Sequence, residues 1–89
     1  MSKQYLIQAN LILEKHKQSD NKIKIAKIAL DNVLLNRQGG AITDLVNNST
    51  VQNIMNILAP FVTNYQIREV VKLLQQFLKD IKNSGRYFT

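Results

Sequence analysis

The amino-acid sequence predicts an all-α protein, a single small bundle of four helices. Apolar residues recur at helical spacing along most of the chain, and no segment alternates apolar and polar residues as a half-buried strand does. The length, 89 residues, suits one domain, and the absence of cysteine removes disulfides as a source of stability. Small domains without such cross-links are usually stabilised by regular helix packing. We expect a bundle domain over residues 1–84 and a short tail over residues 85–89.

The first helix is expected over Ser2–His16. Its apolar stripe keeps the spacing of one helix face and contains Tyr5, Leu6, Ala9, Ile12, Leu13 and His16. Residues 17–21 break this pattern, which predicts a loop. Either Ser19 or Asp20 can cap the following helix by accepting hydrogen bonds from its free N–H groups.

The second helix is expected from about Asn21 to Arg37, with Gly39 and Gly40 ending it because glycine readily takes the left-handed conformation that closes a helix. Its main apolar face contains Ile23, Ala26, Leu30, Val33 and Leu34. A second apolar face contains Ile25, Ile28 and Leu35. A helix that is apolar on two faces usually lies between neighbours, so both faces are expected to be covered.

Residues 41–62 allow two interpretations. Their apolar positions keep helical spacing and are Ile42, Leu45, Val46, Val51, Ile54, Met55, Leu58, Phe61 and Val62. The polar run at residues 47–50 is either a break, with Ser49 capping a new helix, or the polar face of one long helix. Pro60 cannot donate a backbone hydrogen bond and disfavours helical geometry at Ala59, so a kink or an early end is expected there.

The fourth helix has the clearest pattern. Thr63 and Gln66 form a capping box, with Thr63 as the cap and Gln66 at the third helical position. The apolar positions that follow are Ile67, Val70, Val71, Leu74, Phe77, Leu78 and Ile81, and Gly85 is a natural terminator. From the shared stripes, we expect the core to include Leu13, Ala26, Leu30, Leu58, Val70, Leu74 and Phe77.

Residues that could carry catalysis or bind a metal form no recognisable pattern. His16, the one histidine, lies between two lysines, which indicates a helix end near solvent, and no spacing of serine or carboxylate around it fixes a catalytic triad. The six carboxylates are scattered and match no common metal-binding motif. The sequence therefore predicts a protein that binds a partner rather than an enzyme, with no cofactor.

A basic stretch follows the end of the first helix, in a chain whose net charge is +6. Its five lysines are Lys15, Lys17, Lys22, Lys24 and Lys27. They are candidates to face an anionic membrane or another acidic partner. The alternative, which we prefer, is a solvated helix end and loop. Nucleic acid is disfavoured because its binding sites usually use arginine and exposed aromatics, and the chain has three arginines.

The candidate partner-binding residues lie in the fourth helix and the tail. They are Arg68, Arg86, Tyr87 and Phe88. Arginine and aromatic side chains dominate binding hot spots. In the competing interpretation, Tyr87 and Phe88 fold back and cover the bundle, because exposed aromatics are unfavourable in a small domain.

The chain shows no secretion signal and no apolar run near the ~18 residues that a membrane span needs. We therefore expect a cytoplasmic protein, with peripheral contact to an anionic membrane as an option.

Three short strings resemble segments of a known family: Ile25–Asn32 in the second helix, Leu58–Asn64 around Pro60, and Gly85–Phe88 at the end. Through them the chain resembles the bacteriocin immunity proteins of Gram-positive lactic acid bacteria, including the enterocin A and lactococcin A immunity families. The likeness is best over helices two to four. The first helix and residues 47–50 match no pattern of the family, so the subfamily and the cognate bacteriocin stay open.

The resemblance implies an antiparallel four-helix bundle in the cytoplasm that makes the producing cell resistant to its own pore-forming peptide. Such proteins are thought to act on the inner side of the mannose phosphotransferase transporter, the peptide's receptor, by locking or blocking the peptide–receptor complex. Their C-terminal half is associated with specificity. Two rival functions come from the residues alone: a small helical regulator that binds DNA or a repressor, and a homo-oligomeric scaffold.

Overall fold

The computed structural model describes residues 2–36 and 41–84, with side chains for residues 4–35 and 49–81. These residues form α1 (Ser2–His16), α2 (Asn21–Asn36), α3 (Ala41–Leu58), the short 3-10 helix η1 (Ala59–Phe61) and α4 (Tyr65–Ser84). No strand occurs in these ranges, which confirms the all-α prediction. The predicted bounds of the first helix are confirmed. The second helix ends at Asn36, and Arg37, Gly39 and Gly40 lie outside the described residues.

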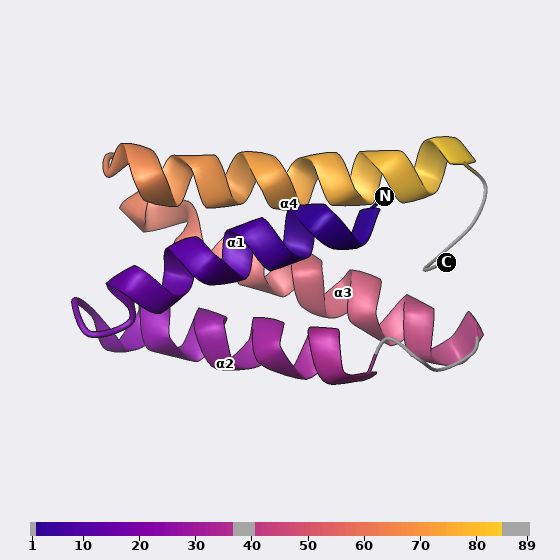
Figure 1. Ribbon diagram of the computed structural model, residues 1–89, viewed down its shortest axis with the longest axis horizontal. Helices are drawn as coiled ribbons and strands as arrows, with labels where there is room; N and C mark the ends of the chain where they lie inside the picture. The colour runs from indigo at the N-terminus through magenta and orange to yellow at the C-terminus, as the bar shows by residue number, and fades with distance from the viewer. Residues whose placement is uncertain (1, 37–40, 85–89) are drawn as a thin grey trace.

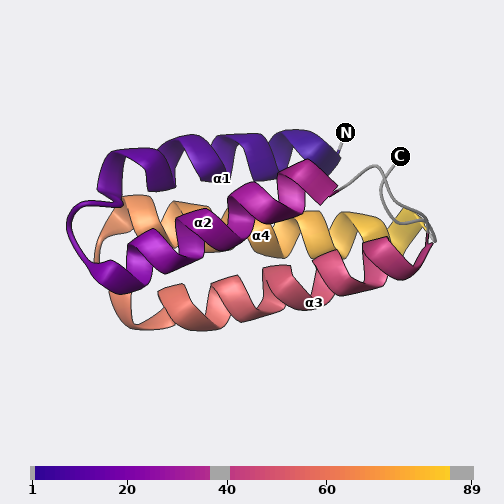
Figure 2. The same cartoon turned by 90° about the horizontal axis from the view of Figure 1, so that it is seen from below.

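The four α-helices form an antiparallel bundle in which successive helices run up and down (Figure 1). α1 packs against α2 and α4, and α3 packs against the same two helices. As a result α2 and α4 lie diagonally across the bundle, which Figure 2 shows with α2 in front and α4 behind. The α1–α2 loop, η1 and the start of α4 meet at one end of the bundle, which we call the loop end.

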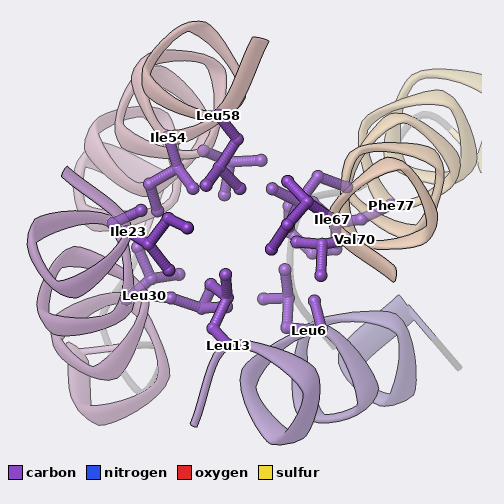
Figure 3. Close-up of a cluster of buried hydrophobic side chains, with 14 of the residues drawn as sticks. Leu6, Leu13, Ile23, Leu30, Ile54, Leu58, Ile67, Val70 and Phe77 are labelled. Carbon is purple, nitrogen blue, oxygen red and sulfur yellow. The ribbon is translucent and has the colours of Figure 1, made fainter. Parts of the chain in front are cut away.

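The core fills the space between the four helices (Figure 3). Its buried residues are Leu6, Ala9 and Leu13 from α1, Ile23, Ala26, Leu30 and Val33 from α2, Val51, Ile54 and Leu58 from α3, and Ile67, Val70, Leu74, Phe77 and Ile81 from α4. Each set follows the steps of three and four residues that place side chains on one helix face. All seven residues that the sequence predicted for the core are in it.

The middle of the chain is one continuous α-helix up to Leu58, and residues 47–50 lie inside it rather than at a break. The α-helix ends where the sequence predicted an effect of Pro60. The proline lacks an N–H group, and the chain tightens into η1 before turning into α4. The turn is closed by the backbone N–H of Asn64, which donates to the carbonyl of Phe61 over 3.0 Å.

The caps of α2 and α4 decide where these helices begin. Asp20 Oδ1 accepts from the backbone N–H of Lys22 over 2.8 Å, so Asp20 is the cap of α2. The predicted cap of the fourth helix is wrong by one residue. Asn64 Oδ1, not Thr63, accepts from the N–H groups of Gln66 at 2.9 Å and Ile67 at 3.4 Å. The turn from η1 brings Asn64 to the start of α4.

Replacing Asn64 by alanine is expected to lower the free energy of unfolding by about 1 kcal/mol, because two N–H groups lose their acceptor. Thr63→Ala is the matched control, with an expected change within about 0.5 kcal/mol. Urea unfolding followed by circular dichroism measures both. A larger loss for Thr63→Ala than for Asn64→Ala would assign the cap to Thr63 after all.

The second apolar face of α2 is exposed, contrary to the prediction that neighbours cover it. The exposed fractions are 55% for Ile25, 50% for Ile28 and 76% for Leu35. In a square of four helices each helix has two neighbours, and α1 and α3 contact α2 on its inner side. The outer side of α2 is left uncovered. Across the described ranges, no helix combines the length and apolar character that crossing a membrane requires.

Candidate interaction surfaces

His16 joins the end of α1 to the start of α4. Its Nε2 atom is hydrogen-bonded to Gln66 Oε1, and the imidazole is half-buried. The side chain of Gln66 is therefore engaged with α1, whereas the predicted capping box would have turned it back toward its own helix. Among the described residues, no three His, Asp or Glu side chains gather closely enough to hold a metal ion.

Lys27 is a structural cation that links α1 to α2. Its Nζ lies 2.8 and 2.7 Å from the two carboxylate oxygens of Asp31 and 3.3 Å from Glu14 Oε1. Only 11% of its side chain is exposed. Lys17 Nζ contacts the other oxygen of Glu14 at 2.8 Å. The charge of Lys27 is balanced within the protein, so this residue is a poor candidate for the membrane-facing role that the sequence suggested.

Asn10 extends this network toward the start of α1. Its Nδ2 donates to Asp31 Oδ1 over 3.1 Å, whereas its buried Oδ1 has no hydrogen-bond partner in the part of the chain that the structure describes. We call the five residues the α1–α2 polar seam: Asn10, Glu14, Lys17, Lys27 and Asp31. Two of its contacts, Lys27–Glu14 and Asn10–Asp31, join α1 to α2, and because each requires one alignment of the two helices, the seam favours a single register.

The seam shifts two pKa values. Hydrogen bonds from Lys17 and then Lys27 hold the pKa of Glu14 below its ordinary value of 4.5. For Lys27, burial by itself disfavours the charged ammonium, but the hydrogen bonds to Asp31 and Glu14 outweigh burial and raise the pKa above 10.5. Both shifts favour the charged forms of the two residues in the folded state.

Acid is expected to weaken the bundle through Glu14. A carboxylate whose pKa is lowered by folding stabilises the protein above its unfolded pKa, here 4.5, and this contribution is lost as the pH falls through the folded value. The stability contribution of Lys27 depends on pH in the opposite direction. Because folding raises its pKa, Lys27 stabilises the protein below pH 10.5, and this contribution is lost as the pH rises through the folded pKa.

In urea unfolding at a series of pH values, the stability difference between the natural chain and Glu14→Gln should be largest above pH 4.5 and should shrink as the pH falls. Glu69→Gln is the matched control, since Glu69 is exposed and has no ion pair among the described residues. A Glu14→Gln variant whose deficit is the same at pH 3 and pH 7 would show that the ion pairs of Glu14 do not stabilise the fold.

Three of the five lysines in the basic stretch remain available to contact a partner. Lys15, Lys22 and Lys24 are exposed, and none has an ion pair within residues 4–35 and 49–81. Lys22 and Lys24 lie in the first two turns of α2, and Lys15 lies at the end of α1, so all three belong to the loop end (Figure 1). The positive end of the α2 dipole adds to their charge.

The sequence pattern did not separate these three lysines from the two that are paired. The Glu14–Lys17 and Lys27–Asp31 contacts, at spacings of three and four residues, were visible in the sequence as pairs that helices often form. The contact of Lys27 with Glu14 joins two helices, and no local spacing signals it.

The outer face of α2 carries exposed apolar residues that sequence reasoning assigned to the interior. We call Ile25, Ile28 and Leu35 the α2 outer stripe. Arg68, a predicted partner-binding residue, is exposed on α4. The other three, Arg86, Tyr87 and Phe88, lie outside the described residues.

Comparison with family models, with curated proteins and with solved structures gives no significant match to this chain.

Proposed function

We propose that this chain is a bacteriocin immunity protein that binds at the cytoplasmic side of the peptide–receptor complex. The observation that carries the proposal is the structure of the segment that follows α3. The string Leu58–Asn64, which resembles an apolar–Pro–apolar segment of the family, contains η1 and the cap of α4. The string Ile25–Asn32 lies wholly within α2. The antiparallel four-helix bundle is the fold that the resemblance implied.

The proposal gives the surfaces two separate roles. Arg68 and the tail residues Arg86, Tyr87 and Phe88 contact the receptor complex, where aromatic and arginine side chains act as anchors. Lys15, Lys22 and Lys24 attract the protein to the anionic inner leaflet, because lysine is a compact hydrated charge suited to long-range attraction. Lys27 belongs to neither role, since its ammonium holds the α1–α2 polar seam.

The test is survival of a sensitive strain that expresses the chain. Cells are challenged with a panel of bacteriocins that use the mannose phosphotransferase transporter, and empty vector provides the control. Protection against at least one peptide, and none against a pore-forming peptide with another receptor, is the expected result. A folded chain, present at normal levels in the cell, that protects against no peptide of the panel contradicts the proposal.

The rival function, a DNA-binding regulator, has one feature in its favour, the three unpaired lysines at the loop end. Its geometry is less suitable. The two helices of a helix-turn-helix cross at roughly 90–120°, whereas α2 and α3 pack antiparallel along each other (Figure 2). We therefore keep immunity as the single proposal.

A further inference from the structure

The α2 outer stripe is an apolar face that no element of the described chain covers. Its residues occupy one side of α2, opposite the buried Ile23, Ala26 and Leu30. At 3.6 residues per turn, Ile28 and Leu35 lie within about 20° of each other around the helix, and Ile25 lies about 60° from Ile28. The stripe is about 15 Å long, and Figure 2 shows α2 in front of the other helices.

Lysine is part of the same face. Lys24 precedes Ile28 by four residues, so its side chain leaves α2 within about 40° of the stripe. Lys22 lies in the first turn of α2, at the other edge of the stripe, three residues before Ile25 and about 60° from it around the helix. Neither lysine has an ion pair among the residues that the structure describes. The carboxylates of Glu14 and Asp31 are engaged by Lys17 and Lys27, and Asp20 accepts from the backbone N–H of Lys22 as the cap of α2. The face therefore combines apolar side chains with uncompensated positive charge.

We propose that α2 docks flat on an anionic lipid bilayer. Ile25, Ile28 and Leu35 enter the boundary between headgroups and acyl chains, and Lys22 and Lys24 contact the anionic headgroups. This pairing of apolar and basic residues along one helix face is the arrangement that holds helices in the plane of a membrane interface. Its cellular role rests on the proposed function, which places the protein at a membrane receptor.

A second copy of the chain fits this face less well. A two-fold dimer places the same patch of both subunits together, so the positive charges of Lys22 and Lys24 from both copies would gather at one interface. Like charges at close range oppose association, whereas anionic headgroups attract the same lysines. Charge complementarity therefore selects the lipid surface as the occupant.

Tryptophan fluorescence tests the orientation, because the chain contains no tryptophan. In the full-length Ile28→Trp variant, emission should shift to shorter wavelength when vesicles of phosphatidylglycerol and phosphatidylcholine are added. Pure phosphatidylcholine vesicles should give a much smaller shift. Tyr65→Trp is the matched control, since Tyr65 is 72% exposed on α4, which lies diagonally opposite α2. The absence of a shift in Ile28→Trp, or an equal shift in both variants, overturns the proposal.

Co-sedimentation with the same vesicles measures how much the apolar stripe and the two lysines each contribute to vesicle binding. The combined change Ile25→Ser, Ile28→Ser and Leu35→Ser should lower binding at least tenfold, since it removes most of the apolar area that inserts. Lys22→Gln with Lys24→Gln should lower binding about fivefold per lysine at low salt. Circular dichroism confirms that both variants fold.

Two results contradict the docking of α2 on lipid. One is unchanged vesicle binding by the serine variant. The other is a natural chain that sediments as a dimer in solution and becomes monomeric in the serine variant, because the stripe is then an interface between copies. No bacteriocin is present in these experiments, so a failure of lipid docking and a failure of the immunity proposal are observed separately.

Discussion

Replacing Leu74 by alanine should lower the free energy of unfolding by about 2–5 kcal/mol. Leu74 is fully buried on α4, the helix that packs against both α1 and α3. The change removes three buried carbon atoms and leaves a cavity that close-packed neighbours fill only in part. For a domain of this length the total stability is on the order of 4–13 kcal/mol, so the loss is a large share of it.

Urea unfolding followed by circular dichroism measures this loss, with Gln75→Ala as the control. Gln75 is exposed next to Leu74 in the same helix, so the control keeps the helix and leaves the core intact. Its expected change is within about 0.5 kcal/mol. Equal losses for the two variants would mean that Leu74 is not part of the core and that the helices pack in another way.

Truncation after Ser84 should abolish protection of a sensitive strain while the bundle stays folded. It removes Gly85–Thr89, and with them the proposed anchors Arg86, Tyr87 and Phe88. Loss of one anchoring residue typically costs about 2 kcal/mol or more, or roughly 30-fold in affinity, and this cost depends little on salt. The truncated chain keeps every buried core residue among those that the structure describes, the last of which is Ile81.

The matched variant replaces Lys15, Lys22 and Lys24 by glutamine and keeps Lys27, which the α1–α2 polar seam requires. Each lysine near an anionic surface contributes about 1 kcal/mol, and salt screens this term. Protection should therefore weaken by an amount that depends on expression level. If the truncated chain folds and still protects fully, the tail has no part in the mechanism. If the lysine variant loses all protection, the lysines carry the recognition and the two proposed roles are reversed.

The fold was largely predictable because its determinants are local. The stripes of α1 and α4 keep helical spacing without interruption, and a helix with one such stripe has one way to face a core. The end of α3 was predictable for the same reason, since Pro60 acts on its own backbone. The choice between one helix and two over residues 41–62 was not predictable, because polar residues at 47–50 fit either a loop or the polar face of a helix.

The misassigned features depend on tertiary arrangement. Ile25 and Ile28 have the composition of a buried face, but the number of neighbours around α2 is a property of the bundle. Thr63 and Asn64 are both good caps, and the geometry of η1 selects Asn64. The role of Lys27 depends on Glu14 of another helix. The surfaces that bear on function were therefore the part that local patterns described least well.

Binding of the purified chain to the detergent-solubilised mannose phosphotransferase transporter tests the proposed mechanism most directly. The measurement is made with and without a bacteriocin against which the chain protects, and with the chain truncated after Ser84 as the control. The expected result is a stable complex with transporter and peptide together, much weaker binding to the transporter alone, and loss of the complex on truncation. A chain that protects cells yet binds the free peptide and not the transporter–peptide complex would contradict the account.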